Sequence, residues 1–167
     1  SIGQVLGLAV PVLLIVRLHT PDWRAYLRLG RPDAGVLGWS LVGWVGLVPI
    51  VQLLERLNRS LPLPEGIRTF DRRQMELVEQ VLASDLGLAL NLVALAVVPA
   101  ICEELLFRGY VQRNFERARG SVYGFLITGL VFAIYHLRLT QLLPLALLGI
   151  YLGYVLWRSR SVWTAAA

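Results

Sequence analysis

Long apolar runs recur along the chain, and they constrain its fold more than any other sequence feature. A helix needs roughly 20 apolar residues to cross the hydrocarbon core of a bilayer. Of the 167 residues, 56% are hydrophobic and only 16% are charged, with a mean hydropathy of +0.62. A soluble domain of this length would carry a more charged surface. The sequence therefore predicts an all-α, polytopic transmembrane helix bundle.

We expect five complete spans and the start of a sixth. Another apolar run begins at 161, after runs over 2–18, 34–54, 86–118, 122–136 and 141–157. The longest polar stretch lies just before residue 86. The chain is therefore divided into 1–85, with N-terminal spans and an interfacial segment, and 86–167, a second helical unit.

Within the polar stretch, one segment has the pattern of an amphipathic helix at the membrane interface. Asp71 is expected to cap a helix that runs to about Leu82. Its apolar residues share one face, as interfacial helices require: Phe70, Leu77, Val78, Val81 and Leu82. We interpret this helix as a solvated connector, with a substrate gate as the alternative.

All 16 basic residues are arginines, and with 11 acids they give a net charge of +5. They lie mostly at the ends of apolar runs, so contact with lipid headgroups explains them better than nucleic acid does. Counted over alternating sides, arginines are in excess on the side that carries Arg113, Arg117 and Arg119. The positive-inside rule places this tip in the cytoplasm. We expect an integral multi-pass membrane protein without a nucleic-acid partner.

Two adjacent carboxylates, Glu103 and Glu104, lie inside the apolar run 86–118. Ionisable groups at membrane depth are costly, so they are candidates for function. Neighbouring helical residues point about 100° apart, so the two glutamates should do different work. Glu104 and Arg108 are four residues apart in the order that favours an ion pair. We assign them to a structural pair, which leaves Glu103 for chemistry.

Gly120 is the expected tip of an antiparallel helical hairpin that brings His136 beside the glutamates. Glu104 and His136 each lie about 24 Å from this tip along their helices, and Glu103 is equally admissible. A partly buried carboxylate beside a histidine can hold and deprotonate water. The pattern favours hydrolysis. An ion pathway and a satisfied polar network within the bundle are the alternatives.

Several neighbours of these residues receive structural interpretations. Phe132, one turn before His136, lines a cavity, locks the histidine rotamer or simply packs. Cys102 is read as a small buried thiol in preference to a nucleophile. Gly149 and Gly153 form a contact face of small residues for another helix.

These residues resemble the CAAX protease and bacteriocin-processing family, also called type II CAAX proteases. Its EExxxR motif is matched by Glu103, Glu104 and Arg108, and its FxxxH motif by Phe132 and His136. The resemblance covers roughly 86–167, the half of the chain it identifies as a catalytic core. It implies a helical intramembrane endopeptidase in which Glu103 activates water with His136, while Glu104 and Arg108 support them. No cofactor is expected, because one Glu and one His are too few ligands for catalytic zinc; zinc is the alternative.

The family's third motif, a histidine followed four residues later by Asn or Asp, would come after 161–164 and is absent up to Ala167. We therefore expect the core to be C-terminally incomplete: inactive if the protein ends here, and able to retain activity if a further helix follows. The alternative function is a non-proteolytic membrane scaffold, or a subunit of a larger membrane complex. Expected partners are membrane lipid and a peptide or membrane-protein substrate. The composition points to a prokaryotic inner (plasma) membrane.

Overall fold

The computed structural model describes residues 2–83 and 87–166, and within them helices are the only regular secondary structure. This confirms the all-α prediction. The predicted boundary at 85/86 lies outside the described residues. The α-helices are α1 (Ile2–Gln4), α2 (Val10–His19), α3 (Trp23–Tyr26), α4 (Ala34–Arg59), α5 (Glu65–Leu82), α6 (Leu88–Leu92), α7 (Val98–Glu104), α8 (Gln112–Arg119), α9 (Ser121–Tyr135), α10 (Leu142–Ser159) and α11 (Val162–Ala166). Between them lie the π-helical turns η1 (Val5–Ala9), η2 (Val93–Val97) and η3 (Leu105–Val111), and the 3-10 turn η4 (Leu139–Gln141).

Four helical stretches are long and apolar enough to cross a membrane. They are Ile2–His19, Ala34–Arg59, Ala89–Arg119 and Leu139–Ser159. The remaining predicted span, 122–136, corresponds to α9, whose 15 residues fall short of this length. The predicted bounds agree with α9 to within one residue, and Gly120, with a φ of 90°, forms the predicted break before it.

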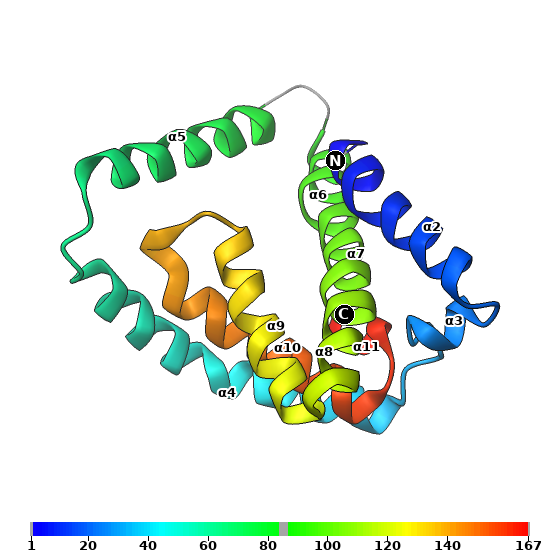
Figure 1. The fold of residues 1–167 in the computed structure, drawn as a ribbon. Helices are drawn as coiled ribbons and strands as arrows, with labels where there is room; N and C mark the ends of the chain where they lie inside the picture. The colour runs from blue at the N-terminus through cyan, green and yellow to red at the C-terminus, as the bar shows by residue number, and fades with distance from the viewer. Residues whose placement is uncertain (1, 84–86, 167) are drawn as a thin grey trace.

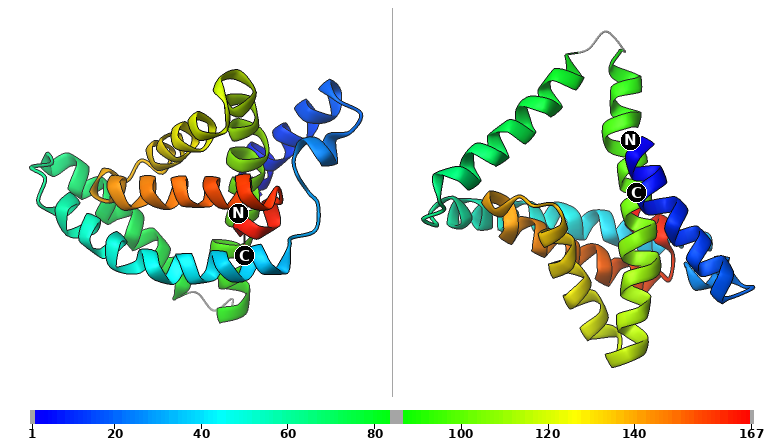
Figure 2. Two further views of the ribbon diagram at one scale, coloured as in Figure 1. Left: turned by 90° about the horizontal axis from the view of Figure 1, so that it is seen from below. Right: turned by 45° about the horizontal axis from the view of Figure 1, so that its top comes forward.

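The second half of the chain is built around one long helical stretch, Ala89–Arg119, which Figure 1 shows as the steep helix labelled α6, α7 and α8. At its end the chain turns back into α9, and α10 then packs against α9. In Figure 2, α10 lies between α9 and α4, which comes from the first half of the chain. The helix order therefore places the 86–118, 122–136 and 141–157 runs side by side, as a bundle requires.

The contact between α9 and α10 depends on glycine. A Cβ atom on Gly129 would lie 2.5 Å from the backbone nitrogen of Ile150, and one on Gly149 would lie 2.8 Å from the carbonyl oxygen of Gly129. A Cβ atom on Gly153 would lie 2.8 Å from the Cβ of Phe125. The two backbones thus approach more closely than any larger residue permits, and the predicted contact face is confirmed.

Helix α5 begins at Glu65, directly after Pro64, so the prediction that Asp71 caps it is wrong. Asp71 lies inside the helix and is buried, and its Oδ2 accepts hydrogen bonds from the backbone nitrogen, at 3.3 Å, and the hydroxyl of Thr140. A tertiary contact from the segment before α10 therefore uses the carboxylate. The predicted apolar face of α5 is exposed, and Figure 1 shows this helix extending away from the bundle.

The glycine contact leads to a test of the bundle. Gly149→Ala is expected to lower the free energy of unfolding by about 1–3 kcal/mol, because the added methyl group meets backbone and not a flexible side chain. Thermal unfolding of the protein in detergent measures this change. The matched control is Gly46→Ala in α4, where a Cβ atom would meet nothing within 4 Å and stability should hold or rise. Equal stability of the two variants would contradict the packing described here.

Candidate active site

Glu103 and Glu104 end α7, immediately before the π-helical turn η3. Arg108 lies in η3, and its Nη1 is 3.1 Å from Oε1 of Glu104. The exposed fractions of these two side chains are 0% and 5%. The structure therefore contains the predicted pair, and it places both charges inside the protein.

Arg108 contacts all three helices of the bundle core. Its Nη2 donates a hydrogen bond to the carbonyl oxygen of Gly149 in α10, at 3.2 Å. Its guanidinium carbon lies 4.3 Å from the ring centroid of Phe132 in α9. A buried charge is tolerated only when it is paired and hydrogen-bonded, so these contacts hold the long helix, α9 and α10 in one arrangement.

Glu103 lies beside His136, which follows the last residue of α9. Its Oε2 is 3.7 Å from Nε2 of the histidine, and the exposed fractions are 16% for Glu103 and 24% for His136. The other ring nitrogen, Nδ1, lies 2.9 Å from the carbonyl oxygen of Phe132. Because a carbonyl can only accept, Nδ1 carries the hydrogen and Nε2 is the atom presented to Glu103.

Phe132 contacts both His136 and Arg108. Its ring centroid is 4.4 Å from that of His136 and 4.3 Å from the guanidinium carbon of Arg108. Phe107 packs against it edge-on, with centroids 5.3 Å apart. These contacts fit two of the three interpretations offered for Phe132, packing and locking of the histidine rotamer.

Sequence reasoning missed two residues that hold the segment after His136. Asn58, fully buried at the end of α4, donates to the carbonyl oxygen of Leu139 at 2.8 Å and accepts from the backbone nitrogen of Leu143 at 3.0 Å. Asp71 binds Thr140 between them. The sequence offered one signal, the side-chain amide of Asn58 near the end of an apolar run. A buried polar group needs a hydrogen-bond partner, so such an amide indicates a contact with another segment.

Sequence reasoning also missed Gln112, which lies one turn after Arg108 and likewise donates a hydrogen bond to a glycine carbonyl of α10. It is fully buried, and its Nε2 donates to the carbonyl oxygen of Gly153 at 2.9 Å. The two glycines that bring α10 close thus also present their carbonyl oxygens to the long helix.

The helices from α6 to α11 can be compared with known protein families. A family model described as type II CAAX prenyl endopeptidase Rce1-like matches residues 85–167, about half of the chain. The chain belongs to the Rce1-like family. Comparison with curated proteins and with solved structures gave no match. The family supports an intramembrane endopeptidase of the CAAX protease type and an integral membrane protein, and it confirms the resemblance carried by the two motifs.

In this Rce1-like chain, another reactive side chain lies beside the glutamates, the thiol of Cys102. Cys102 is buried and packs with Ala9 and Leu105, as its interpretation as a small apolar residue predicted.

Among residues 2–83 and 87–166, no three His, Cys, Asp or Glu side chains lie close enough to hold a metal ion. Glu103 and His136 supply two ligands of the kind zinc uses, and zinc needs a third from the protein.

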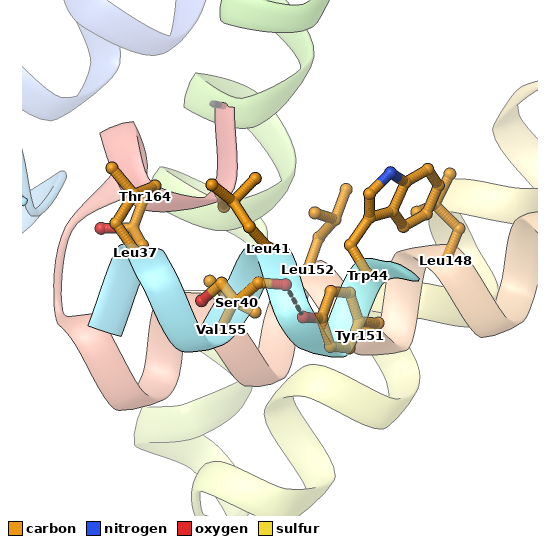
Figure 3. Close-up of a pocket in the computed structure, with 10 residues that line it drawn as sticks. Leu37, Ser40, Leu41, Trp44, Leu148, Tyr151, Leu152, Val155 and Thr164 are labelled. Atoms are coloured by element: carbon orange, nitrogen blue, oxygen red, sulfur yellow. Dashed lines mark hydrogen bonds between the residues drawn. The ribbon is translucent and has the colours of Figure 1, made fainter. Parts of the chain in front are cut away.

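A pocket of about 290 Å³ lies on another side of the bundle, between α4, α10 and α11 (Figure 3). Its lining is mostly apolar, and neither Glu103 nor His136 belongs to it. Figure 3 shows the Tyr151 hydroxyl directed at the carbonyl oxygen of Ser40, to which it donates a hydrogen bond. The approach is close because Gly43 has no side chain: a Cβ atom there would lie 2.6 Å from the Tyr151 oxygen.

The buried pair of the Rce1-like core gives a second prediction. Glu104→Gln is expected to lower the free energy of unfolding by about 3–5 kcal/mol, because Arg108 would remain buried without its counter-charge. Replacing both residues by methionine should cost much less than the sum of the single changes. Thermal unfolding in detergent measures all three variants.

The control is the same helical spacing in an exposed setting. Glu55 and Arg59 also form a pair four residues apart, on the solvent-accessible end of α4. Glu55→Gln should change stability by at most about 1 kcal/mol. A Glu104→Gln variant that is as stable as wild type would show that the pair is not structural.

Proposed function

We propose that the chain is an intramembrane endopeptidase of the CAAX protease-like family, hydrolysing a peptide bond near the membrane face. Glu103 activates water together with His136, and Glu104 and Arg108 support this pair. The observation that carries the proposal is the 3.7 Å separation of Glu103 Oε2 and His136 Nε2 within an apolar helical bundle. At that separation a water oxygen fits within about 2.8 Å of both atoms.

The proposed reaction follows from these two side chains. The Glu103 carboxylate takes a proton from water while the water oxygen attacks the carbonyl carbon of the substrate peptide bond. The carbon–nitrogen bond of the resulting intermediate then breaks, and the proton held by Glu103 passes to the leaving amine. Neutral His136 orients the water by accepting a hydrogen bond at Nε2; once protonated at that nitrogen, it donates to the oxyanion. The resemblance assigns the remaining donor to a His-x-x-x-Asn or Asp segment.

The surrounding residues support this chemistry by position. Arg108 neutralises Glu104, so that a second negative charge does not oppose ionised Glu103 on the next position of the helix. Phe132 contacts the His136 ring and its backbone carbonyl accepts from Nδ1, which holds the histidine in one orientation and one tautomer. Neither contact needs a cofactor.

We also propose where the protein works and what it meets. The arginine-rich tip with Arg113, Arg117 and Arg119 faces the cytoplasm of a prokaryotic inner membrane. Partners are membrane lipid and a peptide or membrane-protein substrate, without nucleic acid. The excess of arginine on the side of this tip, counted over alternating spans of the sequence, supports this orientation.

Peptide cleavage by the full-length protein in liposomes tests the function. Glu103→Gln and His136→Ala are each expected to lower the rate by at least about 100-fold, because each removes a proton-transfer or orienting group. Activity should persist with a zinc chelator. Loss of activity with chelator, restored by zinc, would show metal dependence instead.

Two substitutions serve as matched controls. His19 also places its Nδ1 against the carbonyl oxygen four residues earlier, at 2.7 Å, but lies exposed at the end of α2. Glu79 lies exposed on α5. His19→Ala and Glu79→Gln should cleave at the wild-type rate. Well-folded wild type that cleaves nothing in a broad peptide library would favour the membrane scaffold.

A further inference from the structure

Arginines from three parts of the chain meet at the corner where α8 ends and α9 begins. They line a pocket of about 220 Å³ that also contains one acid, a serine and a tryptophan. The lining residues are Arg28, Arg113, Glu116, Arg117, Ser121, Trp157 and Arg160. Four positive charges and one negative charge leave this pocket with an excess of three positive charges.

Backbone geometry brings two of these arginines into place. Arg28, after α3, and Arg160, after α10, both adopt left-handed conformations, with φ values of 56° and 53°. Their segments are joined by hydrogen bonds from the Val162 nitrogen to the Arg28 carbonyl, at 3.0 Å, and from the Ser161 hydroxyl to the Gly30 carbonyl, at 2.7 Å. Such backbone conformations are unfavourable for residues other than glycine and persist only where the surroundings fix them.

The one acid of the pocket is already engaged. Glu116 accepts from both Nη atoms of Arg28 and, at 2.8 Å, from Nε2 of Gln112. Arg113 reaches it only at 4.0 Å, and the Arg113 Nε is buried without a hydrogen-bond partner in the described part of the chain. Among the described residues, Arg117 and Arg160 have no acidic partner within 4.0 Å. Arg113 and Arg160 thus line the pocket without full compensation, and the Arg117 guanidinium, also without an acid, lies 4.6 Å from the ring centroid of Tyr26.

We propose that this pocket binds the phosphate group of an anionic phospholipid headgroup. The guanidinium fork matches two phosphate oxygens at once, and several arginines around one pocket suit a phosphate better than a carboxylate. The backbone N–H groups of the first turn of α9 begin at Ser121, within the lining, and no side chain caps them. Both features favour a compact anion with several acceptor oxygens.

The position of the pocket favours lipid as the source of the phosphate. It lies where α9 begins and where the long helix and α10 end, at the boundary between apolar helix and charged residues. Trp157 in its wall is the residue type that concentrates at headgroup depth. Its two arginines on the long helix, Arg113 and Arg117, lie about 15 and 21 Å along that helix from Glu103, so the pocket is separate from the proposed active site.

Lipid binding to the purified full-length protein in detergent, measured by native mass spectrometry and by thermal shift, tests the proposal. Phosphatidylglycerol should bind and raise the melting temperature, and phosphatidylcholine should do neither. The double variant Arg113→Gln/Arg160→Gln should bind phosphatidylglycerol at least about tenfold more weakly. Arg56→Gln, an exposed arginine near the end of α4, is the matched control and should bind as wild type does.

Ser121→Glu provides a variant that should fold without difficulty. A carboxylate in the first turn of α9 stabilises the helix while it fills the pocket with negative charge, so basal stability should hold while the response to phosphatidylglycerol falls. Inorganic phosphate distinguishes the sources: a shift with phosphate alone, equal to that with the lipid, would assign the site to a soluble phosphate. Wild-type lipid binding by both pocket variants, or equal loss in Arg56→Gln, would overturn the proposal.

Discussion

A buried guanidinium holds the functional half of this protein together. Arg108 is fully enclosed, and it contacts Glu104, a backbone carbonyl of α10 and the face of Phe132. Each contact comes from a different place in the bundle. Because an unpaired charge would be very unfavourable inside the protein, the helices cannot move apart without losing these contacts. This arrangement of the helices also sets the distance between the Glu103 and His136 side chains.

Glycine gives the bundle its second constraint. Gly149 and Gly153 let α10 approach its neighbours, and their carbonyl oxygens then lie within reach of Arg108 and Gln112. Where apolar side chains gain little by leaving lipid for protein, close backbone contact and hydrogen bonds carry more of the association between helices. The same two glycines therefore allow close helix packing and supply hydrogen-bond acceptors to buried polar side chains.

Much of the site could be read from sequence because its geometry is local. Helical spacing predicts the Glu104–Arg108 pair, and a hairpin centred on Gly120 brings Glu103 level with His136; the structure contains both arrangements. The roles of Asp71 and Asn58 could not be read, because their partners lie 69 to 85 positions away and depend on how α4 and α5 meet the segment before α10. The bounds of α9 were predicted to within one residue, because Gly120 marks the turn before it.

Asn58 and Asp71 connect the family-matched region to the first half of the chain. The family match covers residues 85–167, yet the chain directly after His136 is bonded to Asn58 and Asp71, which lie outside it. The position of His136 therefore depends on residues that lie outside the region shared with the family. An excised 85–167 fragment, or a chimera that joins it to foreign N-terminal helices, would retain both motifs but lose the contacts that fix one of them in space.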